Sequence, residues 1–168
     1  RDYKVTGVQT CALPIYAWQL LFEPRYVSRL KGCGVSVLDS ATEVVPAALH
    51  YLGKPPFSRS MADYRAVVPL LRQIRPYITL FSSASYINDM ANGSICLALG
   101  WSGDINIARQ RALDAHTGQH IEALLPRRGG LLFMDTMVIP ADAPHPRNAH
   151  RLDRKSTRLN SSHLVISY

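Results

Sequence analysis

The chain has 168 residues, of which 47% are hydrophobic and 18% charged, a composition typical of a globular domain with its own core. The net charge of +7 is concentrated at the ends, because residues 16–153 hold 14 Lys and Arg against 11 Asp and Glu. This distribution argues against nucleic-acid binding, which needs a continuous basic surface. The apolar runs are far shorter than the roughly 20 residues that cross a bilayer, which excludes a membrane-spanning chain.

The two ends differ from the body of the chain. Residues 1–15 (RDYKVTGVQTCALPI) show neither a helical nor a strand period, and residues 154–168 (RKSTRLNSSHLVISY) follow abruptly on a helix start at 144–153. Both strings resemble translated sequencing-adapter sequence, and natural flexible tails are the alternative. We therefore expect two non-native tails around a body that is truncated on both sides, so that a signal peptide would be lost.

Within the body, helical and strand patterns alternate. Helices are expected from Pro24 to Gly32, from the cap candidates at 39–43 to Leu52, over Ala62–Arg75, from Ser82 to Met90 and over Asp104–Asp114. Strands are expected at Val35–Leu38, Tyr77–Phe81, Ile95–Leu99, His120–Leu125 and Leu131–Ile139. This alternation predicts an α/β fold with a largely parallel sheet flanked by helices, in which ligands bind at the carboxyl ends of strands.

Two pairs of an aromatic ring and a carboxylate fall at such strand ends. Trp101 and Asp104 lie in the turn GWSGD after a buried strand, and Phe133 and Asp135 share one face of the last strand. Carboxylates that bind ammonium groups, beside rings that cover a carbon chain, suit an alkyl ammonium ligand. The alternative is structural, with Trp101 and Phe133 in the core and Asp104 stabilising a helix N-terminus.

The same turn also permits a catalytic interpretation. Ser102 lies at the tip of a strand–turn–helix, as in a G-x-S-x-G nucleophile elbow, and His116, His120 and His150 follow as candidate bases. However, Asp104 stands where that motif requires a small residue, and its charge would oppose a developing oxyanion. A serine acyl-hydrolase is therefore a remote alternative, and no catalytic residue is assigned.

Two cysteines remain in the body, Cys33 and Cys96. An isolated pair fits neither a four-ligand zinc site nor a CxxC redox motif, and no metal site or cofactor is expected. Their spacing is compatible both with one disulfide and with two buried thiols. A disulfide would indicate an oxidising compartment such as the periplasm.

Residues 17–143 resemble the putrescine- and spermidine-binding periplasmic proteins of polyamine ABC importers. The resemblance rests on CGVSVLD, ALHYLGK, SYINDMANG, SICLALGWSGD and LLFMDTMVIPADA, which occur in the family's order with similar spacing. It implies an incomplete fold: one lobe, the second, of a two-lobed, type II-like binding protein that closes on its ligand. On this interpretation residues 16–143 form that lobe, including a strand that returns towards an absent first lobe.

The resemblance also implies a function and a set of residues. The whole protein would be a periplasmic receptor, not an enzyme, that captures a polyamine and delivers it to the membrane permease subunits of an importer. Trp101, Asp104, Phe133 and Asp135 would line the ligand cleft, and Cys33 and Cys96 would form a disulfide. A receptor for another small amine or polar solute is the alternative.

Glu43 matches a further acidic ligand-binding position of the family. It also has a local explanation, because Ser40-x-x-Glu43 is a capping-box pattern in which the carboxylate returns to a backbone N–H. Both roles stay open for this residue.

Overall fold

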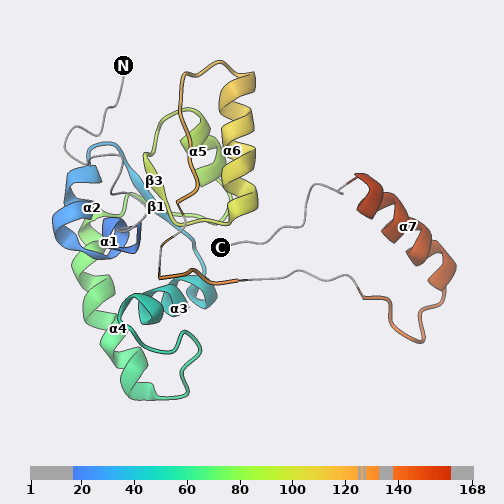
Figure 1. The fold of residues 1–168 in the computed structure, drawn as a ribbon, viewed down its shortest axis with the longest axis horizontal. Helices are drawn as coiled ribbons and strands as arrows, with labels where there is room; N and C mark the ends of the chain where they lie inside the picture. Colours follow the sequence, from blue (N-terminus) through green and yellow to red (C-terminus); the bar gives the residue numbers. More distant parts are fainter. Residues whose placement is uncertain (1–16, 125, 127, 133–137, 160–168) are drawn as a thin grey trace.

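The computed structural model describes residues 17–124, 126, 128–132 and 138–159. Their elements in chain order are α1 (Ala17–Phe22), α2 (Pro24–Leu30), β1 (Val35–Val37), α3 (Ala41–Tyr51), α4 (Met61–Ile74), the 3-10 helix η2 (Arg75–Tyr77), β2 (Leu80–Phe81), α5 (Tyr86–Ala91), β3 (Leu97–Ala98), α6 (Ser102–Asp114) and α7 (Pro146–Leu159). The fold is α/β, as the sequence predicts. Figure 1 shows α5 and α6 on one side of β1 and β3, and α1 and α2 on the other.

The described strands form one parallel sheet in the order β2-β1-β3. In its register Ser36 pairs with both Leu80 of β2 and Ala98 of β3. All three residues of β1 are buried, as expected for a central strand that is covered on both faces. Because the strands are parallel, the turns that follow β1, β2 and β3 all lie at the same edge of the sheet.

The core lies between the sheet and its helices. It is built from the buried strand residues and from the apolar faces of the helices, with Phe22, Val27, Leu49 and Tyr86 among its most deeply buried side chains. Helices α3 and α4 pack against each other, as do α5 and α6. Helices α3 and α6 begin just after β1 and β3, so both start at the edge of the sheet at which predicted ligand residues lie.

The strand predictions were too long. A strand was predicted over Tyr77–Phe81, but Tyr77 ends the 3-10 helix η2 and only Leu80–Phe81 pairs with β1. The predicted strand 95–99 is reduced to Leu97–Ala98, whose side chains are half-buried. The cause is the partner strand, because β1 offers only three residues for pairing.

Two further strand predictions are not supported. Residues 120–124 belong to no strand, and neither do 131–132 or 138–139. Residues 125 and 133–137 lie outside the described part of the chain. Helix predictions were closer: α5 begins at Tyr86 rather than just after Ser82–Ser83, and α6 begins two residues before Asp104.

Helix α7 stands apart from the rest of the fold (Figure 1). It runs from Pro146 to Leu159 and so continues past residue 153, the predicted end of the body. In the part of the chain that the structure describes, no helix is long and apolar enough to cross a bilayer.

Candidate functional site

The topology selects one place at the edge of the sheet. The chain leaves β1 towards β2 on one side, whereas β3 lies on the other side of β1. Neighbouring strands of this kind form a topological switch point, where α/β folds bind their ligands. Glu43 lies in the first turn of α3, which follows β1, and Trp101 and Asp104 lie at the start of α6, which follows β3. Three of the five predicted ligand residues therefore flank the switch point.

Trp101 and Asp104 are positioned by the start of α6. Trp101 is the N-cap residue, with extended backbone angles (φ −80°, ψ 144°), and Asp104 lies in the first turn. Both side chains are half-buried, and Trp101 packs against the core. A carboxylate at this point also interacts favourably with the positive end of the helix dipole. The structural roles suggested by the sequence are thus real, and they leave both side chains partly accessible.

A third residue links these two. The hydroxyl of Tyr86 donates a hydrogen bond to Asp104 Oδ2 at 2.7 Å and accepts one from the backbone N–H of Trp101 at 3.2 Å. Burial, followed by this hydrogen bond to Asp104, raises the pKa of the Tyr86 phenol well above its usual value. The phenol therefore stays protonated and remains a donor to the carboxylate at any physiological pH.

Sequence reasoning did not assign a role to Tyr86. The residue lies in the string SYINDMANG and is completely buried as the first residue of α5. A buried tyrosine usually finds a hydrogen-bond partner, which is the signal that could have drawn attention to it. The partner itself lies 18 residues away in sequence, so no local pattern reveals it.

Gly100 is explained by the same tyrosine. A Cβ atom at this position would collide with the Tyr86 ring and would lie 2.8 Å from both Cζ and the hydroxyl oxygen. The backbone of the turn after β3 therefore passes directly over the ring. Glycine at residue 100 permits this close approach.

Glu43 does not form the predicted capping box. Ser40 is the N-cap residue of α3 but makes no side-chain capping hydrogen bond, so the capping-box prediction was wrong in its geometry. The Glu43 carboxylate instead accepts hydrogen bonds from the hydroxyls of Ser40 and Thr42. Its role towards a ligand stays a prediction, and the same is true of Phe133 and Asp135, which lie outside the described residues.

The predicted disulfide is confirmed. Cys33 and Cys96 are bonded, with their Cα atoms 5.5 Å apart. They lie just before β1 and β3, at the edge of the sheet opposite to the candidate site. In the described residues no group of three or more His, Cys, Asp or Glu side chains could hold a metal ion.

The geometry argues against the hydrolase alternative. Ser102 is the first residue of α6, whereas His116 follows its last residue. At a rise of 1.5 Å per residue, the two are about 20 Å apart along the helix, far beyond hydrogen-bonding reach. His120 and His150 are exposed, and His150 lies on α7.

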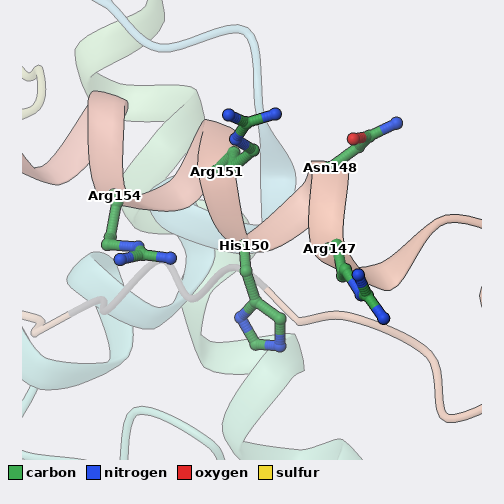
Figure 2. A pocket seen from close by; sticks show the side chains of 5 residues that line it. All are labelled: Arg147, Asn148, His150, Arg151 and Arg154. Atoms are coloured by element: carbon green, nitrogen blue, oxygen red, sulfur yellow. The ribbon is translucent and has the colours of Figure 1, made fainter.

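A hollow beside α7 is a separate feature. Figure 2 shows that it is lined by Arg147, Asn148, His150, Arg151 and Arg154, all from this one helix. Three guanidinium groups without a carboxylate would repel a cation. The hollow therefore does not match the ligand chemistry of the strand-end site.

The chain is similar to known solute-binding proteins over most of its length. The model of the bacterial extracellular solute-binding protein family matches residues 11–152. The putrescine-binding periplasmic protein SpuD of Pseudomonas aeruginosa (strain UCBPP-PA14) is 45% identical over 136 residues, which cover 81% of this chain and 37% of SpuD.

Two other relatives come from enteric bacteria. The putrescine-binding periplasmic protein PotF of Escherichia coli K12 is 41% identical over 149 residues, which cover 88% of this chain and 40% of PotF. A spermidine/putrescine-binding periplasmic protein of Salmonella typhimurium is 29% identical over 138 residues, 82% of this chain and 36% of that protein. The chain thus spans about two fifths of the length of these relatives.

Proposed function

Because the chain belongs to the bacterial extracellular solute-binding protein family, we propose that it forms one lobe of a receptor for polyamines of the putrescine and spermidine class. One observation carries this proposal. Trp101 and Asp104 follow the carboxyl end of β3, and the buried hydroxyl of Tyr86 is hydrogen-bonded to the Asp104 carboxylate and to the Trp101 backbone N–H. A carboxylate and an indole at the start of one helix, next to a switch point, suit an alkyl ammonium ligand.

Asp104 would bind an ammonium group of the ligand. Its hydrogen bond from Tyr86 occupies Oδ2, and since a carboxylate has lone pairs on both oxygens, it can bind the phenol and an ammonium group together. The indole of Trp101 would cover the methylene chain. Phe133 and Asp135 would repeat the pair, Glu43 would add a further acid, and the other lobe of the receptor would close the cleft.

The whole receptor would act in the periplasm and deliver its ligand to the permease subunits of an ABC importer. Its relatives are named as periplasmic binding proteins. The disulfide between Cys33 and Cys96 supports such a location, because disulfides persist in oxidising compartments. A receptor that releases its ligand unchanged needs no catalytic group or cofactor.

Calorimetry with the full-length receptor that carries this chain tests the proposal. Putrescine and spermidine should bind tightly, whereas 1,4-butanediol, a neutral analogue of putrescine, should not, because it lacks the charges that Asp104 would bind. Equal affinities for 1,4-butanediol and putrescine, or no binding of any amine, would contradict the proposal. Turnover of an ester that depends on Ser102 would favour the hydrolase instead.

A further inference from the structure

We propose that Tyr86 is a positioning residue of the ligand site, which holds the carboxylate of Asp104 and the backbone of Trp101 in the arrangement that binds an amine. This inference rests on the proposed function. It assigns Tyr86 a role beneath the ligand-contacting surface, because the phenol is completely buried and cannot itself contact a solute.

The hydroxyl of Tyr86 uses its hydrogen-bonding capacity on these two residues. Its single proton goes to Asp104 Oδ2, and a lone pair of its oxygen accepts the Trp101 N–H. The direction of the first bond follows from chemistry, since a carboxylate can only accept. One buried group therefore sets both the rotamer of the acid and the course of the turn that carries the indole.

The tyrosine is itself held rigidly. Its ring lies against Gly100, where even a methyl group would not fit. Its helix α5 is tied to α6 by a hydrogen bond of 2.6 Å from Arg111 Nη1 to Asn88 Oδ1. The Thr117 hydroxyl, just after α6, donates to the carbonyl of Ala91 at the end of α5. The phenol is thus fixed relative to Asp104 at three points.

A carboxylate that is fixed before the ligand arrives loses no side-chain freedom on binding, which strengthens the complex. Replacing Tyr86 with Phe removes only the hydroxyl and keeps the ring. Asp104 would then be free to turn towards solvent, and the Trp101 N–H would lose its acceptor. We expect Tyr86→Phe to weaken putrescine binding by about tenfold in the full-length receptor.

Tyr64→Phe is the matched control. Tyr64 also donates its hydroxyl to a protein oxygen, the carbonyl of Ser58 at 2.8 Å, but it lies on α4 and this bond involves neither Trp101 nor Asp104. Its replacement should leave the affinity unchanged. Equal affinities of Tyr86→Phe and the unmodified receptor, or equal losses in both tyrosine variants, would overturn the positioning role.

A double-mutant cycle separates positioning from a general loss of stability. In an Asp104→Ala background no carboxylate or amide oxygen is left for Tyr86 to position, so Tyr86→Phe should then weaken binding by less than about threefold. A merely structural role would reproduce the full tenfold loss in this background. That additive result would contradict the proposal.

Amide hydrogen exchange of Trp101 in the ligand-free receptor gives a readout that does not depend on amine binding. Exchange at this amide should be slow in the unmodified protein and fast in Tyr86→Phe. If no amine binds but this exchange difference is found, the proposed function fails while the hold of Tyr86 on the turn stands. Unchanged exchange overturns the inference whether or not amines bind.

If Tyr86→Phe does not fold, proton NMR of the unmodified receptor addresses the same contact. A slowly exchanging phenolic proton with a cross-peak to the Trp101 amide should be present with and without putrescine. Loss of this cross-peak when putrescine binds would show that the hydroxyl has left the turn, and would contradict the inference.

Discussion

Cys33 and Cys96 join the residues that precede β1 and β3, the two strands whose opposite ends carry the candidate site. The bond closes a loop across a sequence separation of 63 residues, which contains β1, α3, α4, η2, β2 and α5. It therefore links β1 and β3 at the amino edge of the sheet, while Tyr86 links α5 to the start of α6 at the carboxyl edge.

Removing this disulfide should lower stability without changing ligand affinity. For a loop of this length, the chain-entropy model predicts a loss of about 4 kcal/mol in the free energy of unfolding. Urea denaturation of the receptor with Cys33→Ala and Cys96→Ala measures it. Dithiothreitol should destabilise the unmodified protein by a similar amount and leave the double variant unaffected. A large drop in putrescine affinity in the folded variant would contradict the separation of the two edges.

Gly100→Ala should damage both stability and binding. The added methyl group must displace the Tyr86 ring or the turn, and overpacking of this kind costs about 1–3 kcal/mol. Gly32→Ala is the matched control, because a Cβ atom there meets no atom within 4 Å. Thermal unfolding and putrescine titration of both variants test the difference. Equal behaviour of the two would mean that the turn moves away from Tyr86 without cost.

The sequence predicts the helices of this chain well because their signals are local. Pro24 opens α2, and buried apolar residues at helical spacing mark α3, for example Val44, Ala47 and Ala48. Strand lengths depend on partners that are distant in sequence. Residues 95–99 read as a five-residue strand, yet β1 pairs with only two of them.

The candidate site likewise contains residues that local sequence predicts and one residue that it does not. Trp101 and Asp104 could be predicted because a strand-to-helix turn and its residue types lie within one short string. Tyr86 could not, since its two hydrogen bonds cross to residues 15 and 18 positions away. The cysteine spacing left two possibilities open, and the family resemblance, not the spacing, predicted the bond that the structure contains.

Asp104→Asn should weaken putrescine binding by about 1.5–3 kcal/mol, the range of a hydrogen bond to a charged group. The amide keeps an oxygen that can accept the Tyr86 hydroxyl but loses the charge that attracts ammonium. Asp114→Asn, at the exposed far end of the same helix, is the control and should bind normally. Isothermal titration of both variants decides whether Asp104 acts on the ligand; equal affinities would exclude it from the site.

His50→Ala should weaken the attachment of Arg128 and Gly129, which precede Phe133 and Asp135 in the chain, to the rest of the fold. His50 Nε2 lies 3.0 Å from the carbonyl oxygen of Arg128 and 3.1 Å from that of Gly129, and Trp18 Nε1 donates to the latter at 3.0 Å. Loss of the imidazole should cost about 1 kcal/mol.

Hydrogen exchange at Gly129, whose amide donates to the carbonyl of Pro126 at 2.9 Å, reports on this anchor. The amide should exchange faster in His50→Ala and at the normal rate in the control His120→Ala, whose side chain is exposed. Unchanged exchange in both variants would show that Trp18 alone holds the segment.

The stability of the folded protein should depend on pH in the acid range because of Asp63, a residue of α4 that contacts the preceding loop. A hydrogen bond from Ser58 Oγ at 2.6 Å and, to a smaller extent, the Lys54 ammonium at 3.2 Å lower the pKa of the Asp63 carboxyl. A carboxyl with a lowered pKa in the folded state stabilises the protein above the pKa of the unfolded chain, about 4. That contribution is lost as pH falls through the folded value.

Asp63→Asn should therefore lower the melting temperature at pH 7 and lose this effect progressively below about pH 4. The Ser58 hydrogen bond is the largest single cause of the lowered pKa of Asp63, so we expect Ser58→Ala to reproduce more of the change than Lys54→Gln. Added salt should weaken the effect of Lys54→Gln more, since that contact is a partly exposed ion pair. Scanning calorimetry between pH 2 and pH 7 tests this order. A larger effect of Lys54→Gln would show that the ion pair, not the hydroxyl, stabilises the loop.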